Sequence, residues 1–373
     1  IIKINFLIFL ITILIFYFRN FLENPFLKLS FLFIIFISLG STIGDSQYTA
    51  FAWDPRSLWF FHAKRIFYDE SILSIADNYA NWSHNEYPNL APAFASSLAV
   101  LIGHWNEVFP KLSFSMMFLP PMILVYAFLK DTQYLIFLSI VFFTIGNYLF
   151  NGYVDGLVAM YFCISAFLMY LLIIANTDFY KKKVFFYIIT FSFFVTLTLI
   201  KNEGIALLFI LFGATFLIKL YKKELKRDIS KLIILSFSFV PIILWKLFCY
   251  FNEIGSINIQ IFSTDMFLYL LPRMGDLNNY KIISYYLLVN EKFLFTSIFF
   301  FISCWINWNR EIFNFVVIVT LSYILVLSFT FLSSPLDFYF QVHTTATRVI
   351  KALSFLLAFF GLYNLSITKR NFL

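Results

Sequence analysis

Charged residues are scarce in this 373-residue sequence: Asp, Glu, Lys and Arg make up 13% of it, against 61% hydrophobic residues. Soluble globular domains carry about 25% charged residues, so an ordinary soluble domain is excluded. Cysteine is also rare, and Cys163, Cys249 and Cys304 lie inside apolar runs without the paired spacing of a disulfide framework or a metal site. We interpret them as small core residues. No linker, repeat or low-complexity tract divides residues 1–373, so a single transmembrane domain is expected.

Long apolar runs fill most of the chain, and phenylalanine alone contributes 54 residues. About 20 apolar residues allow a helix to cross the hydrocarbon layer, and the alternating pattern of membrane-spanning β-barrels is missing. We therefore predict an all-α, polytopic integral membrane protein surrounded by membrane lipids, with about eleven transmembrane helices. The predicted spans are residues 5–18, 27–43, 112–129, 133–150, 156–175, 184–200, 205–219, 232–251, 293–309, 312–332 and 349–367.

The net charge of +7 comes from Lys and Arg residues in short loops between apolar runs. Such loops mark the cytoplasmic side of a membrane protein, and no basic stripe accompanies an aromatic platform, so nucleic acid is not an expected partner. The basic loops 19–28, 181–183, 219–231 and 369–370 all fall inside if residues 88–103 form a re-entrant or surface helix. Enrichment in Phe, Ile, Lys and Asn fits an AT-rich bacterial genome, so we expect a bacterial inner (plasma) membrane. The sequence begins at Ile1 and not at Met, so a few residues are expected to precede it.

This orientation brings the unusual polar residues to the opposite, periplasmic or external face. The segments expected there are 44–92, Asp155, Lys201 to Glu203, 252–283 and 333–348. The convergence follows from charge bias and span counting alone. We therefore expect the functional groups to gather on one face of the membrane.

The longest stretch without a predicted span, residues 44–92, is too apolar for a disordered loop. From Trp53 to Tyr68 aromatic residues alternate with basic ones, which is typical of a helix lying in the membrane interface. Asp54 stands at the start of that helix, before Pro55, and is either a helix N-cap or an acid at the mouth of a cavity. Spacing does not choose between Asp54 and three rival carboxylates in the same loop, Asp45, Asp69 and Asp77.

Two further sets of charges interrupt apolar runs. Asp155 begins a predicted span, and a charge at mid-bilayer would cost about 2.5 to 3.5 kcal/mol. We therefore expect Asp155 at an interface or facing a polar cavity, or simply as a helix cap. Lys201 and Glu203 stand in a Lys-Asn-Glu-Gly step between two runs. They either serve a site or form a short turn whose charges compensate each other.

Arg348 precedes the last predicted span. A cation at a membrane boundary usually anchors the helix by snorkelling. On the external face, however, the charge bias disfavours a cation. This raises the prospect that Arg348 binds an anion such as phosphate through bidentate hydrogen bonds.

Together these motifs resemble the GT-C superfamily of membrane glycosyltransferases, which includes protein O-mannosyltransferases and the lipid A aminoarabinose transferase. The helical first large external loop WDPRSLWFFHAKRIF, residues 53–67, is similar to the acid-bearing loop of that superfamily, and HNEYPNLAP, with His84 and Tyr87, is similar to its end. The segments GYVDGLVAMY, KNEG and TTATRVIKAL complete the resemblance. Two predicted helices precede the loop, whereas the superfamily usually has one, and no soluble C-terminal domain is expected to follow.

The resemblance implies transfer of a sugar from a polyprenyl-phosphate donor to a hydroxyl or amine of a lipid, glycan or protein acceptor. Asp54 would be the catalytic base, and Arg348 and Lys201 would bind the donor phosphate. Asp155, His84, Tyr87 and Glu203 would assist the substrate or a metal. A single displacement predicts inversion. Asp54 and Asp155 would suit magnesium or manganese if a metal is used.

Two other classes remain open from the sequence. A transporter or flippase of lipid-linked glycans would also need many spans, but transporters usually show repeats or paired broken helices near the midplane. A polysaccharide polymerase or ligase would also work on lipid-linked sugars at the external face. Such enzymes tend to carry arginines in a late loop, whereas the large loop here is early and acid-bearing.

Overall fold

The computed structural model describes residues 53–106, 109–129, 131–145, 152–175, 183–255 and 266–370. Every element within these ranges is a helix of the α, 3₁₀ or π type. This confirms the all-α prediction. The predicted spans 5–18 and 27–43 lie outside the described residues, as does Asp45.

The described residues form two compact units. The first takes those of 1–74, 91–136 and 147–153, and the second takes those of 75–90, 137–146 and 154–373. The expectation of a single domain stays a prediction. The helices of the first unit are η1 (Pro55–Trp59), α3 (Phe60–Asp69), most of α4 (Leu90–Ile102), α5 (Phe109–Met117), α6 (Leu119–Leu129) and the start of α7 (Asp131–Ile145).

The predicted loop helix is present in the first unit as η1 followed by α3. Its aromatic residues divide between two environments: Trp53 is exposed, whereas Trp59 and Phe60 are buried. Phe60 stacks on Phe114 of α5, with ring centroids 5.2 Å apart. One face of this helix therefore packs inside the first unit and does not lie in a membrane interface.

Helix α4 lies within residues 88–103, the segment that must not cross the membrane if all the basic loops are cytoplasmic. It has 13 residues, a rise of about 20 Å, whereas the hydrocarbon layer is about 30 Å thick. The predicted span 112–129 is likewise divided, because α5 ends at Met117 and α6 begins at Leu119, just before Pro120 and Pro121. Proline is tolerated in the first turn of a helix, but in the interior of a helix it interrupts the hydrogen bonding.

The second unit holds the rest of α7 and most of the chain. Its helices are η2 (Ser74–Asp77, from Ile75), η3 (Asn81–Ser83), α8 (Asp155–Met169), η5 (Tyr170–Ile174), α9 (Lys183–Ile200), α10 (Glu203–Tyr221), α11 (Leu225–Ser236), η7 (Phe237–Phe239), α12 (Val240–Phe251), α13 (Met266–Gly275), α14 (Leu277–Leu288), α15 (Glu291–Ile306), α16 (Arg310–Ser333), α17 (Phe338–Val349) and α18 (Lys351–Arg370). Helices also occupy much of two segments in which no span was predicted: α13 and α14 begin inside 252–283, and α17 fills most of 333–348.

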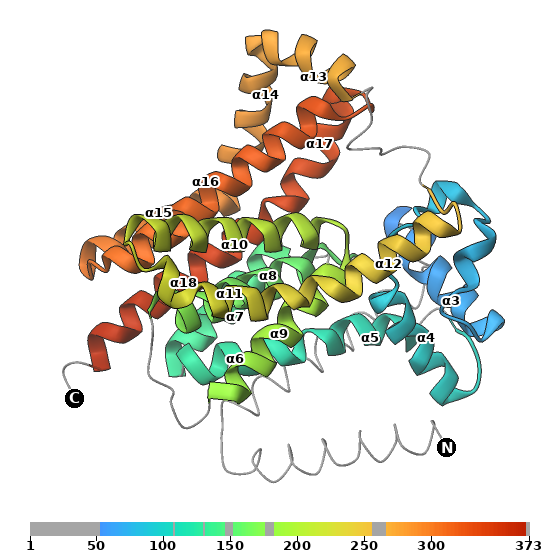
Figure 1. The fold of residues 1–373 in the computed structure, drawn as a ribbon, viewed down its shortest axis with the longest axis horizontal. Coiled ribbons are helices and arrows are strands. Elements are labelled where there is room, and N and C mark those ends of the chain that lie inside the picture. Colours follow the sequence, from blue (N-terminus) through green and yellow to red (C-terminus); the bar gives the residue numbers. More distant parts are fainter. Residues whose placement is uncertain are drawn as a thin grey trace. The chain divides into compact units, whose positions relative to one another are not determined.

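Helix α8 is the centre of the second unit. All of its residues are buried, and it contacts α9, α10, α17 and α18 (Figure 1). Phe167 of α8 meets Tyr363 of α18 edge to face at 4.6 Å, and the Cys163 thiol donates to the Phe355 carbonyl at 3.5 Å. All three cysteines are free and buried, which confirms their interpretation as core residues.

Several helices of the described residues are long and apolar enough to cross a membrane. Five qualify, or six if the pair α14 and α15, bent by 69°, counts as one broken span. The count of eleven is not confirmed, since α4, α6, α7 and α9 are shorter apolar helices. The apolar side chains that α15 leaves exposed include Leu294, Ile298, Phe301 and Trp305. Their helical spacing forms a stripe suited to lipid contact.

The five long stretches are Asp155–Ile174, Glu203–Tyr221, Leu225–Phe251, Arg310–Ser333 and Phe338–Ile367.

Candidate functional site

Four residues that the sequence singled out meet in one cluster of the second unit. Asp155 stands at the first position of α8, Lys201 in the turn between α9 and α10, Glu203 at the start of α10, and Arg348 near the end of α17. They come from separate segments because α8 contacts α9, α10 and α17. We call these four, together with Lys351 of α18, the Asp155 cluster.

The carboxylate of Asp155 lies between two cations. Lys201 Nζ donates to Asp155 Oδ1 at 3.1 Å, and Arg348 Nε lies 3.6 Å from Asp155 Oδ2. Lys201 Nζ also lies 2.6 Å from Glu203 Oε1, so the predicted pairing of these two charges is present. The helix-cap alternative for Asp155 is wrong, because Val154 occupies the N-cap position and Asp155 pairs with Lys201 instead.

Electrostatics keep Lys201 positively charged. Burial by itself would lower the pKa of its ammonium group, but the carboxylates of Asp155 and Glu203 outweigh burial and hold this pKa well above its ordinary value. Lys351 is also buried and lies close enough to act electrostatically on Asp155. The three cations and two carboxylates of the cluster carry a formal charge of +1.

The turn that carries Lys201 and Glu203 depends on Gly204. A Cβ at this position would meet the backbone oxygen of Leu197 at 1.9 Å, which no side chain can tolerate. The amide of Gly204 donates to the Lys201 carbonyl at 2.9 Å and closes the turn. Glycine therefore allows α9 and α10 to approach closely enough to aim Lys201 at Asp155.

Tyr323 and a small cavity complete the site. The Tyr323 hydroxyl donates to the Val349 carbonyl at 3.0 Å, which ties α16 to the end of α17 beside Arg348. Asp155, Lys201, Glu203, Tyr323 and Arg348 line a cavity of about 10 Å³. A space of this size holds roughly one water molecule, so the cluster is closed in this conformation.

The end of the loop approaches the same cluster. Tyr87 lies close enough to Lys201 to interact with it electrostatically. His84 stacks on Tyr87 at 5.1 Å, and its Nδ1 lies 3.4 Å from Glu86 Oε1. The backbone of Glu86 is held in turn by Lys246, whose ammonium donates to its carbonyl at 2.9 Å.

Asp54 belongs to the first unit and is half-buried. It occupies the N-cap position of η1, before Pro55, yet its side chain makes no capping hydrogen bond. Two of its rivals in the loop have local partners: Asp69 lies 3.6 Å from Arg65, and Asp77 accepts from the Tyr79 amide at 2.9 Å.

A divalent metal does not fit at Asp155. Both of its oxygens face cations, Lys201 and Arg348, which would repel a metal ion at the same carboxylate. Within the described ranges no group of three or more His, Cys, Asp or Glu residues gathers to bind a metal. We therefore assign magnesium or manganese no role at this cluster.

Lys351 and Tyr323 were not identified from the sequence as site residues. Lys351 falls inside the predicted span 349–367, and Tyr323 inside 312–332. The spacing of Lys351 from Arg348, three residues along the chain, was an available signal, since such residues face the same side of a helix. Tyr323 gave no comparable signal.

Comparison of the chain with models of protein families, with curated proteins and with solved structures found no match.

Proposed function

We propose that this chain is a membrane glycosyltransferase that moves a sugar from a polyprenyl-phosphate donor to an acceptor hydroxyl or amine, with inversion. The observation that supports the proposal best is the Asp155 cluster, a partly buried group of charges with a formal charge of +1. A phosphodiester carries one negative charge, so binding of a donor phosphate would neutralise the cluster. We place the reaction at the external face of a bacterial inner membrane, following the charge bias of the loops.

The chemistry needs few groups. The acceptor atom attacks the anomeric carbon, the bond from that carbon to the phosphate oxygen breaks, and the bonding electrons leave with the phosphate. Arg348 and Lys201 stabilise the growing negative charge, and Arg348 suits a phosphate because its guanidinium donates two parallel hydrogen bonds. The acceptor proton passes to a general base, for which we propose Asp54. Asp155 holds the two cations in position.

The proposal is tested by incubating the purified full-length chain with a panel of polyprenyl-phosphate sugars and acceptors and detecting released polyprenyl phosphate by mass. Arg348→Ala should lower the release by about 10- to 100-fold, because a hydrogen bond to a charged group contributes about 1.5 to 3 kcal/mol. Lys226→Ala, which removes an exposed cation outside the cluster, should leave it unchanged. An equal effect of both variants would refute a role for Arg348 in donor binding.

Asp54→Asn should lower the release by at least 100-fold, the usual contribution of a general base, without loss of expression. Asp69→Asn is the matched control, since Asp69 is a carboxylate of the same helical region paired with Arg65. Activity retained in Asp54→Asn would transfer the base to another carboxylate, with Asp45 the next to test.

The same preparations separate the transferase from a flippase. In sealed vesicles a flippase moves the intact donor between leaflets and releases no lipid phosphate. Movement of the intact donor between leaflets without release of polyprenyl phosphate would refute the transferase proposal.

A further inference from the structure

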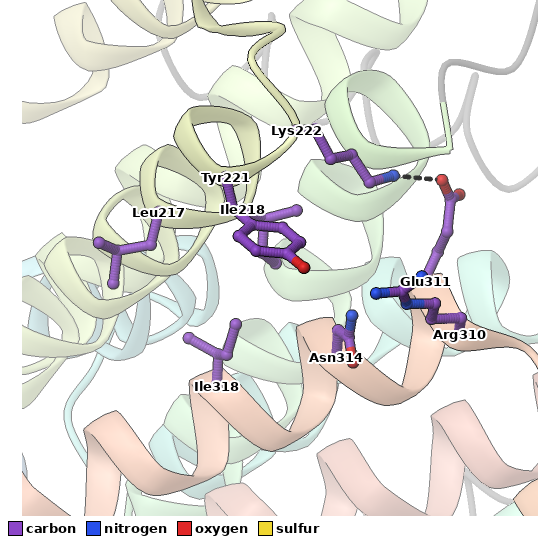
Figure 2. A pocket seen from close by; sticks show the side chains of 8 residues that line it. All are labelled: Leu217, Ile218, Tyr221, Lys222, Arg310, Glu311, Asn314 and Ile318. Carbon is purple, nitrogen blue, oxygen red and sulfur yellow. Dashed lines mark hydrogen bonds and ion pairs between the residues drawn. The ribbon is translucent and has the colours of Figure 1, made fainter.

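A second polar site lies at the other end of α10 from the Asp155 cluster. Helices α10 and α16 contact each other, and a cavity of about 650 Å³ opens beside the end of α10 and the start of α16. Tyr221, Lys222, Arg310, Glu311 and Asn314 supply its polar lining (Figure 2). Pockets that hold small molecules have similar volumes, about 300 to 1,000 Å³.

Two hydrogen-bond donors of this cavity are available to a ligand. Lys222 is paired with Glu311, as Figure 2 shows. Arg310, by contrast, is exposed and makes no ion pair within the described part of the chain. The half-buried side chain of Asn314 makes no hydrogen bond to another described residue. A guanidinium and an amide that line one cavity can both donate hydrogen bonds to an anion.

The length of α10 indicates the depth of this cavity in a membrane. The 19 residues from Glu203 to Tyr221 rise about 28 Å, close to the roughly 30 Å of the hydrocarbon layer. Trp305 and Trp308, at the turn into α16, are exposed, as is typical of aromatic residues at headgroup level. The cavity therefore lies at the membrane boundary opposite the Asp155 cluster.

The lining also changes in polarity along the two helices. Leu217 stands one turn before Tyr221 in α10, and Ile318 stands one turn after Asn314 in α16, both nearer the middle of their helices. The apolar part of the cavity thus faces the hydrocarbon and the polar part faces the headgroups. A phospholipid has the same gradient, whereas free phosphate has no apolar part.

We propose that this cavity binds an anionic phosphoglycerolipid. Arg310 and Asn314 donate to its phosphate, and Leu217 and Ile318 contact the start of an acyl chain. The site is independent of the proposed transferase activity. The folded chain therefore retains a lipid at this end of α10 whether or not it transfers a sugar.

The test is native mass spectrometry of the full-length chain, purified in detergent with an equimolar mixture of phosphatidylglycerol and phosphatidylcholine. The wild type should retain phosphatidylglycerol preferentially. Arg310→Gln should lower its retention about fivefold, because a basic residue near an anionic lipid surface contributes about 1 kcal/mol. Asn314→Ala should lower retention as well. Lys226→Ala removes an exposed cation beyond the cavity lining and should retain as much as the wild type.

Equal retention of the two lipids by the wild type would overturn the proposal, as would unchanged retention in both cavity variants. If Arg310→Gln does not fold, Asn314→Ala decides alone. A further arm adds inorganic phosphate to delipidated chain and measures the thermal midpoint, and adds it to lipid-loaded chain and measures lipid retention. A midpoint rise that depends on Arg310, together with loss of lipid from the loaded chain, would assign the cavity to free phosphate and overturn the lipid assignment.

Discussion

Removal of the Asp155 carboxylate tests the Asp155 cluster without reference to any activity. In Asp155→Asn the cluster loses its central negative charge, so the buried Lys201 and Lys351 and the partly buried Arg348 have only Glu203 to balance them. We expect the variant to be strongly destabilised. The cause would be uncompensated positive charge, not lost packing, since the amide has nearly the shape of the carboxylate.

The distances set the magnitude. With an effective dielectric constant of about 20, charges separated by 3.1 Å and 3.6 Å attract each other by about 5 kcal/mol per contact. Desolvation offsets much of this attraction. Breaking a buried ion pair by removing one partner costs about 3 to 5 kcal/mol in practice. We therefore expect Asp155→Asn to lose about 3 to 5 kcal/mol of unfolding free energy.

A double-mutant cycle separates charge from packing. Lys201→Met removes the closest cation, so the combined variant Asp155→Asn/Lys201→Met should regain about 2 kcal/mol relative to the sum of the single variants, within the usual range of coupling between residues in contact. The assay is unfolding of the purified chain in mixed micelles by increasing fractions of SDS, followed by circular dichroism. Additive effects of the two substitutions would refute the ion-pair reasoning.

Three further predictions follow from the same geometry. Gly204→Ala should destabilise the chain by about 1 to 3 kcal/mol or more, the usual cost of overpacking, because its Cβ would strike the Leu197 carbonyl. Gly213→Ala, with open space around its Cβ, should be neutral or slightly stabilising. Equal thermal midpoints of the two variants would contradict the predicted clash at Gly204. The stability difference between wild type and Lys201→Met should be constant from pH 6 to 7: a raised lysine pKa contributes stability that is full below the unfolded value, about 10.5, and is lost only above it. A decline of this difference within that range would show that burial outweighs the carboxylates. Tyr323→Phe should cost about 0.5 to 1.5 kcal/mol by removing the hydrogen bond to Val349, and an unchanged SDS midpoint would argue against that bond.

The sequence could identify most members of the cluster because charges are conspicuous in apolar surroundings. In lipid an ionisable side chain must find a partner or a polar cavity. Asp155, Lys201, Glu203 and Arg348 each stand at the edge of an apolar run, so each drew attention separately. The start of α8 at Asp155 and the turn at Lys201 also lie where the apolar runs predicted them.

The pairing of Asp155 with Lys201 and Arg348 could not be predicted. Which cation meets which carboxylate depends on how α8 packs against α9, α10 and α17, and hydropathy does not contain that information. Lys351 was not identified because a single charge does not prevent the surrounding residues from being predicted as an apolar span. The helices within 252–283 were missed because they are short and rich in polar residues, and a local cap such as Asp276, which accepts from the Asn278 amide at 2.9 Å, is a weak signal by itself.

The two polar sites at the ends of α10 differ in what each should control. Residues separated by more than about 10 Å without shared partners usually act independently, and the length of α10 exceeds this distance well over twofold. Lipid retention should therefore depend on Arg310 and not on Arg348, whereas sugar transfer should depend on Arg348 and not on Arg310. If Arg310→Gln reduced sugar transfer as strongly as Arg348→Ala, in protein of unchanged stability, the two ends of α10 would be coupled. The lipid would then be a regulator of the reaction and not only a constituent of the fold.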